Sequence, residues 1–192
     1  MQDAQPHSLQ APSLVIVVSR YNDSITGPLL EGALSTFSRR WPGATPSVLR
    51  SPGAFELVAM SSAALRTGAF EAVIALGCVI KGQTTHDQIL NDAVAQGLAR
   101  LAADAGVPVC FGVITAATEQ QARDRAGGAK GNKGAEAMAA ALEAVDELRR
   151  LRAAAAHNRP EMLAPEAMPE LSGSADKTRT ARLAGDNGKG SA

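Results

Sequence analysis

The chain alternates four times between short β-branched apolar runs and longer segments with helical periodicity. The first run, at residues 14–18, reads LVIVV without a polar break, which is typical of a strand buried on both faces. Further strands are expected near 46–50, at 72–80 and at 107–114, and helices over 24–40, 54–67, 84–105, 118–126 and 136–152. Because helices that link parallel strands form right-handed crossovers, this alternation predicts an α/β fold, with a four-stranded parallel sheet and helices on both faces.

The length of 192 residues and the 45% hydrophobic content suit one domain with its own core. We expect that domain over residues 13–152, preceded by a polar, flexible arm at 1–12. Residues 153–192 lack apolar periodicity and are predicted to form a disordered tail. No apolar stretch approaches the ~20 residues that span a bilayer, and the first apolar run is too short for a signal peptide. The sequence therefore predicts a cytoplasmic protein.

Charge and cysteine content exclude several classes of function. Lys and Arg together number 19, as do Asp and Glu, so the net charge of zero argues against nucleic-acid or anionic membrane partners. Cys78 and Cys110 both lie in apolar runs, which favours buried, reduced thiols. Neither a disulfide framework nor a set of metal ligands can be assembled from the cysteines and histidines. The P-loop and dinucleotide-binding motifs are also missing from the sequence.

In parallel sheets, ligands bind beyond the carboxyl ends of the strands, so the residues that follow each strand are the candidates for a site. Only six residues of the chain are aromatic, and three of them are expected at or near this edge: Tyr21, Phe55 and Phe111. A ring placed there could stack on a flat heterocycle, although filling the core remains the alternative for each of them.

The segment that follows the third expected strand predicts an anion site. Thr84 and Asp87 have the spacing of a capping box, Gly82 permits a tight turn before them, and Lys81 could add positive charge. His86 is the one histidine of the expected domain, and it falls in the first turn of the helix. Because histidine can donate and accept protons near neutral pH, His86 at this place suggests general acid–base chemistry. The alternative is that His86 is an ordinary exposed helix residue without a catalytic role.

The basic, glycine-rich segment at residues 123–134 allows two interpretations. It could join two helices with solvated charges, or it could bring Arg125 to an anion, because a guanidinium matches the geometry of phosphate oxygens.

Taken together, these motifs resemble the 6,7-dimethyl-8-ribityllumazine synthase family. The resemblance rests on GAFE at 53–56, GCVIKGQTTH at 77–86, FGVIT at 111–115, RAG at 125–127 and GNKG at 131–134. It implies a flavodoxin-like three-layer sandwich, no cofactor or metal, and a homopentamer with sites between neighbouring subunits. The implied reaction condenses 5-amino-6-(D-ribitylamino)uracil with 3,4-dihydroxy-2-butanone 4-phosphate, releases phosphate and water, and forms the precursor of riboflavin.

The same resemblance implies roles for individual residues. His86 matches the histidine that moves protons. The aminouracil would contact Tyr21, Ala54, Phe55, Glu56, Cys78, Val79, Ile80 and Phe111. The phosphate would contact Gln83, Thr84, Arg125 and Lys133. The chain departs from the family pattern at Gln83, at Val58 and at residues 116–117.

Two other functions are compatible with such a pocket: a flavin- or lumazine-storing protein without turnover, and a structural shell. Family members that form shells of 60 subunits have no insertion in the joint before the last helix, and the joint at residues 127–134 resembles theirs in length. We therefore predict a shell rather than a free pentamer or a dimer of pentamers. Riboflavin synthase is a further candidate partner.

Overall fold

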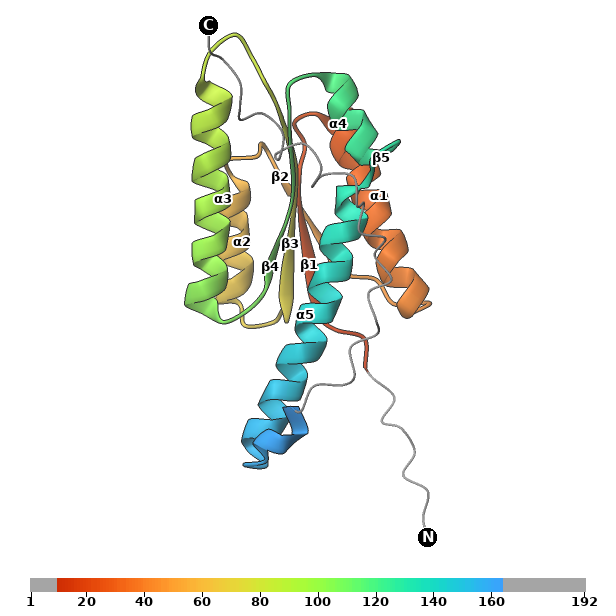
Figure 1. The fold of residues 1–192 in the computed structure, drawn as a ribbon, viewed down its shortest axis with the longest axis vertical. Coiled ribbons are helices and arrows are strands. Elements are labelled where there is room, and N and C mark those ends of the chain that lie inside the picture. Colours follow the sequence, from red (N-terminus) through yellow and green to blue (C-terminus); the bar gives the residue numbers. More distant parts are fainter. Residues whose placement is uncertain (1–9, 164–192) are drawn as a thin grey trace, which may run out of the picture.

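The computed structural model describes residues 10–163 and contains the predicted four-stranded parallel sheet. Its strands are β1 (Leu14–Ser19), β2 (Ser47–Ser51), β3 (Ala72–Ile80) and β4 (Val109–Ala116), in the spatial order β2-β1-β3-β4. Every neighbouring pair is parallel, so all four carboxyl ends meet at one edge, the upper edge in Figure 1.

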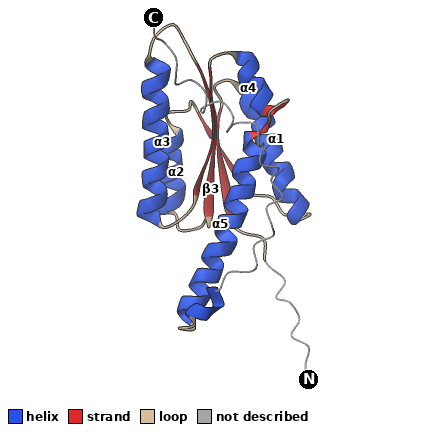
Figure 2. Ribbon diagram, viewed as in Figure 1, coloured by secondary structure: helices blue, strands red, loops and turns tan. Residues whose placement is uncertain are grey.

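Helices cover both faces of the sheet, which confirms the flavodoxin-like three-layer prediction (Figure 2). One layer holds α2 (Leu57–Arg66) and α3 (His86–Ala105). The other holds α1 (Asp23–Arg40), α4 (Glu119–Arg125) and α5 (Lys133–Ala156).

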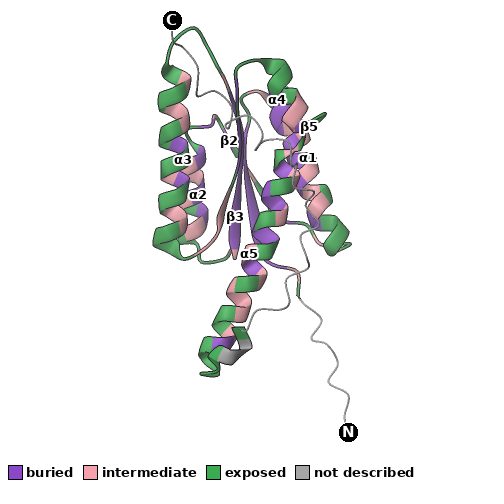
Figure 3. Ribbon diagram, in the orientation of Figure 1, coloured by how far each residue is buried: buried purple, intermediate pink, exposed green. Residues whose placement is uncertain are grey.

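The core is divided by the sheet into two apolar layers. Ile16 and Ile74 pack on the side of α1 and α5, while Val15, Val17 and Val73 pack on the side of α2 and α3. All six residues of β1 are buried, as the uninterrupted apolar run predicts for a strand covered on both faces (Figure 3).

Two helices begin later than predicted, both at the edge where the strands end. The second helix starts at Leu57 rather than at residue 54, because residues 52–56 form a turn. The third starts at His86, with Thr85 at the N-cap and no side-chain cap. The predicted capping box between Thr84 and Asp87 is therefore wrong: the Thr84 hydroxyl accepts only a long bond, 3.4 Å, from the His86 backbone N–H.

The C-terminal helix is longer than predicted. α5 runs to Ala156, and a 3-10 turn at Pro160–Leu163 packs against it. Ala154, near the end of α5, is only 2% exposed. Residues 153–163, which the sequence analysis placed in the predicted tail, therefore include the end of α5 and the 3-10 turn. The remainder of the predicted tail, 164–192, and the arm residues 1–9 lie outside the described residues. The expected joint before α5 contains a small antiparallel hairpin, β5 (Ala126–Gly128) with β6 (Gly131–Asn132).

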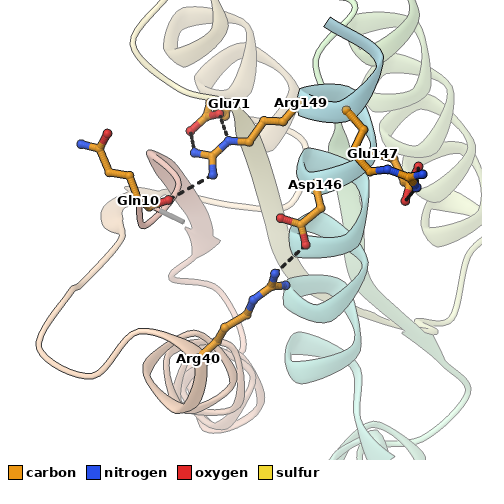
Figure 4. A network of polar contacts seen from close by, with 7 residues as sticks. Gln10, Arg40, Glu71, Asp146, Glu147 and Arg149 are labelled. Atoms are coloured by element: carbon orange, nitrogen blue, oxygen red, sulfur yellow. Dashed lines mark hydrogen bonds and ion pairs between the residues drawn. The ribbon is translucent and has the colours of Figure 1, made fainter. Parts of the chain in front are cut away.

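A polar cluster at the opposite edge of the sheet joins the N-terminal segment and α5 to the chain just before β3 (Figure 4). The Arg149 guanidinium donates to both carboxylate oxygens of Glu71, at 2.7 and 2.6 Å, and to the Gln10 carbonyl oxygen. The hydrogen bond from Arg149 holds the pKa of the Glu71 carboxyl below its ordinary value. This cluster lies far from the carboxyl edge, and we assign it to stability. Within residues 10–163, no helix is long and apolar enough to cross a membrane.

Candidate active site

A cavity of about 450 Å³ opens at the carboxyl edge of the sheet. Three strand ends and the start of α3 supply its walls. The lining residues are Tyr21, Asn22, Gly53, Ala54, Phe55, Glu56, Cys78, Val79, Ile80, Gly82, Thr84, His86, Asp87 and Leu90. Most of the residues selected from the sequence therefore share one cavity, because parallel strands bring their following loops to the same edge.

Two aromatic rings at this cavity are strongly exposed in the single chain. Tyr21 is 71% exposed and Phe55 is 60% exposed, so neither ring fills the core. Rings of this kind offer flat apolar faces to a ligand. The arrangement fits stacking on a planar heterocycle between the loops that follow β1 and β2.

Asn22 is a cavity residue that the sequence analysis missed. It precedes α1 in the left-handed region, with φ of 59°, and its side-chain amide donates to the Cys78 carbonyl oxygen at 3.0 Å. The signal that could have found it is local: asparagine just before a helix, after a strand, is among the residues that tolerate this conformation best.

His86 is the first residue of α3 and lies exposed at the cavity wall. Its neighbour Asp87 lines this cavity as well, and one Asp87 carboxylate oxygen is buried without a hydrogen-bond partner in the described structure. An exposed imidazole at a cavity wall can exchange protons with both a ligand and bulk water.

Cys78 contributes a neutral wall rather than a nucleophile. Its side chain is buried in β3, and burial, with a smaller contribution from the charge of Glu119, raises the pKa of the Cys78 thiol to about 11. Because thiolate is the reactive form, the group is inert near neutral pH. Cys110 is half-buried in β4, and burial raises its pKa to about 11 as well.

Comparison with known proteins shows which family the chain belongs to. The family model for 6,7-dimethyl-8-ribityllumazine synthase matches residues 11–149. Relatives named 6,7-dimethyl-8-ribityllumazine synthase include one from Phocaeicola vulgatus, 45% identical over 68% of this chain and 79% of its own. Another, from Thermococcus gammatolerans, is 43% identical over 71% of this chain and 87% of its own. A third, from Syntrophus aciditrophicus, is 45% identical over 71% and 89%.

The chain belongs to the 6,7-dimethyl-8-ribityllumazine synthase family. The family match ends at residue 149, so the last turns of α5 and the 3-10 turn lie beyond the matched region.

Arg125 lines a second cavity of about 500 Å³, beside the first. This cavity is bounded by α3, α4 and the end of β4, and it also contains Lys81. The Arg125 guanidinium donates to the Gln121 carbonyl oxygen at 2.9 Å. Asp87 lines both cavities and stands between them. One chain therefore does not place Arg125 directly opposite Thr84.

Three further residues selected from the sequence do not line the cavity of their own chain. Gln83 is exposed in the loop before α3. Phe111, in register with Ala75, is 47% exposed on the outermost strand β4. Lys133 begins α5, where its ammonium pairs with the Glu136 carboxylate at 2.5 Å. Gln83 thus lies in the loop that leads to His86, whereas Phe111 and Lys133 belong to other elements and do not line the cavity that contains His86.

No cluster of three or more metal-ligating side chains occurs among the residues that the structure describes. The side chains that line the two cavities can stack, form hydrogen bonds, bind anions and transfer protons.

Proposed function

We propose that this protein condenses 5-amino-6-(D-ribitylamino)uracil with 3,4-dihydroxy-2-butanone 4-phosphate, yielding 6,7-dimethyl-8-ribityllumazine with release of phosphate and water. The observation that carries the proposal is the cavity in which exposed rings and a histidine meet, in a chain whose residues 11–149 match the family. Because the lumazine product is the immediate precursor of riboflavin, this would be the penultimate step of riboflavin synthesis.

The aminouracil binds in the 450 Å³ cavity in this proposal. Tyr21 stacks on the pyrimidine ring, since its ring is exposed and its neighbours line the wall. The edge of the ring and the ribityl chain meet the two polypeptide segments that border Tyr21. These are Ala54, Phe55 and Glu56 after β2, and Cys78, Val79 and Ile80 at the end of β3. The Glu56 carboxylate can accept hydrogen bonds from ribityl hydroxyls.

The phosphate of the four-carbon substrate binds at the start of α3. Gln83 and Thr84 lead into this helix, whose N-terminus carries a partial positive charge that favours anions. Arg125 and Lys133 supply charge-assisted bonds to the same phosphate. Metal ions and cofactors play no part in this proposal.

His86 transfers protons between the reacting groups. An amine attacks a ketone and the addition product loses water, a proton leaves carbon as the phosphate group departs, and closure of the second ring expels a second water. Each step moves a proton at near-neutral pH, and an exposed imidazole at the cavity wall can take it up and return it. Holding the two substrates together supplies much of the remaining acceleration.

The complete site needs two subunits in this proposal. Phe111, Arg125 and Lys133 do not line the cavity that contains His86 of their own chain. A neighbouring copy brings these three residues to that cavity within a homopentamer, and twelve pentamers form a shell. Riboflavin synthase is the proposed further partner. The proposed compartment is the cytoplasm, and cell fractionation tests this location.

The deciding experiment is an assay of the purified full-length chain with both substrates, followed by the absorbance of the lumazine product. We expect product formation that requires both substrates. Tight binding of the lumazine without any turnover would contradict the proposal and identify a storage protein instead.

A further inference from the structure

Four polar side chains are fully buried among residues 10–163: Ser19, Thr26, Ser51 and Ser61. The first three cluster at the carboxyl edge of the sheet, next to the candidate active site. Ser19 ends β1 and Ser51 ends β2, and the two serines are partners in the parallel register of these strands. Each strand thus finishes in a buried hydroxyl immediately before the loop that carries an exposed ring.

Ser19 holds the backbone of Tyr21. Its hydroxyl oxygen accepts a hydrogen bond from the Tyr21 backbone N–H at 3.1 Å and lies 3.4 Å from the Tyr21 carbonyl oxygen, to which it donates. The Ser19 carbonyl oxygen in turn accepts from the Thr26 hydroxyl at 2.8 Å. Both polar groups of the Tyr21 backbone are therefore satisfied by one buried side chain, which fixes the start of the loop.

Ser51 plays the equivalent part in the second loop. Its hydroxyl donates to the Gly53 carbonyl oxygen at 2.8 Å, two residues before Phe55. Its carbonyl oxygen accepts from the Arg20 backbone N–H, also at 2.8 Å. The loops that carry Tyr21 and Phe55 are consequently linked to each other through Ser51.

The far end of the Tyr21 loop is fixed as well. Asn22 adopts a left-handed conformation and its amide donates to the Cys78 carbonyl oxygen, while its own carbonyl oxygen accepts from the backbone N–H groups of Ile25 and Thr26. Tyr21 therefore combines a ring that is 71% exposed with a backbone that is braced on both sides. A braced backbone fixes the direction in which the Tyr21 side chain leaves the chain, so no backbone freedom has to be lost when a ligand stacks on the ring.

We propose that Ser19 and Ser51 are positioning residues, which set the rings of Tyr21 and Phe55 at the binding geometry before the pyrimidine arrives. The proposal rests on the proposed function and adds residues that never touch the substrate, because both hydroxyls are fully buried. Rigid placement of binding groups by a buried second layer of hydrogen bonds is a general requirement of precise sites.

Ser61 offers a matched control within the same chain. It is also a fully buried serine, it lies in α2, and its hydroxyl has no hydrogen-bond partner in the described structure. Replacing any of these serines by alanine removes the same oxygen atom from a buried position. Only Ser19→Ala and Ser51→Ala also release a loop of the site.

The test measures KM for each substrate and kcat in the three single variants, and then in double variants with Tyr21→Ala and Phe55→Ala. We expect Ser19→Ala and Ser51→Ala to raise the KM of the aminouracil roughly three- to tenfold, the range for losing one net hydrogen bond. The KM of the butanone phosphate should stay within about twofold, and Ser61→Ala should match the wild type. Ser19→Ala should add nothing in the Tyr21→Ala background, nor Ser51→Ala in the Phe55→Ala background, because each serine acts through its ring.

The result that overturns the proposal is an equal effect of Ser19→Ala with and without the Tyr21 ring, or kinetics indistinguishable from those of Ser61→Ala. Equal rises in both KM values would also overturn it, since they indicate general damage. If Ser19→Ala does not fold, the double-mutant cycle of Ser51→Ala with Phe55→Ala decides the question alone. An inactive wild type would refute the proposed function instead, so the two failures are distinguishable.

Discussion

Gly134, in the first turn of α5, lies so close to Leu29 of α1 that a β-carbon at Gly134 would be 2.0 Å from the Leu29 carbonyl oxygen. Asn132 completes this junction. Its amide N–H donates to the Pro28 carbonyl oxygen at 2.9 Å, while its side-chain oxygen accepts from the Gly134 backbone N–H. The GNKG segment at 131–134 therefore caps α5 and joins it to α1. This junction fixes the position of the Lys133 backbone relative to α1.

Gly134→Ala should strongly destabilise the protein, because the added carbon would meet backbone atoms that cannot rotate away. We expect a loss of about 1–3 kcal/mol or more in the free energy of unfolding, measured by denaturant titration. Gly27→Ala in α1 is the control, since a β-carbon at Gly27 meets nothing within 4 Å. That variant should gain about 0.5–1 kcal/mol from reduced backbone entropy. Equal stability of the two variants would disprove the close packing.

His86→Ala should lower kcat while the protein assembles normally. A positioned acid–base group contributes about 10²–10⁴-fold, and we expect the lower end because substrate positioning carries much of the rate. His157→Ala is the control, since His157 caps the end of α5 and does not line the cavity. An unchanged kcat of His86→Ala across neutral pH would rule out the proton-transfer role.

Arg125→Ala should raise the KM of the butanone phosphate more than that of the aminouracil. Loss of a charge-assisted hydrogen bond costs roughly 1.5–3 kcal/mol, or about tenfold to over a hundredfold in affinity. Arg123→Ala is the matched control in the same helix, because Arg123 is exposed, pairs with Glu119 and lines neither cavity. Equal rises for both substrates in Arg125→Ala would contradict the phosphate assignment.

The stability of the protein should fall as pH rises between 9 and 11, partly through Cys78. Burial raises the pKa of the Cys78 thiol from 9.0 to about 11, so the unfolded chain loses this proton first. The contribution is therefore fully present below pH 9 and is lost as pH approaches 11, amounting to roughly 2 kcal/mol. Urea titrations at pH 8 and 10.5 test it. Cys78→Ala should show a smaller difference between the two pH values, and an unchanged difference would argue against the buried, protonated thiol.

Light scattering at neutral pH should detect a particle above about 1 MDa, as expected for sixty copies of the 19.7 kDa chain. The physical reason is the short glycine-bearing joint, which the structure folds into the compact β5–β6 hairpin and which leaves no long insertion before α5. A stable particle near 100 kDa, five copies of the chain, would instead establish a free pentamer.

The sequence by itself determined the sheet and its helical layers. Continuous runs such as residues 14–18 and 72–80 can only be buried on both faces, and the helical segments between them force parallel strands. It also placed Tyr21, Phe55 and His86 at one edge, because residues that follow parallel strands share an edge regardless of loop detail. These conclusions depend on local periodicity and chain order, which the sequence displays directly.

Only the tertiary structure decided the contacts between residues distant in the chain. The pairing of Ser19 with Ser51, the bond from Asn22 to Cys78, and the approach of Gly134 to Leu29 depend on strand register and helix packing. The start of α3 at His86 and the separation of Arg125 from Thr84 were fixed in the same way. Register and packing minimise the free energy of the whole core, so no local pattern of residues reveals them.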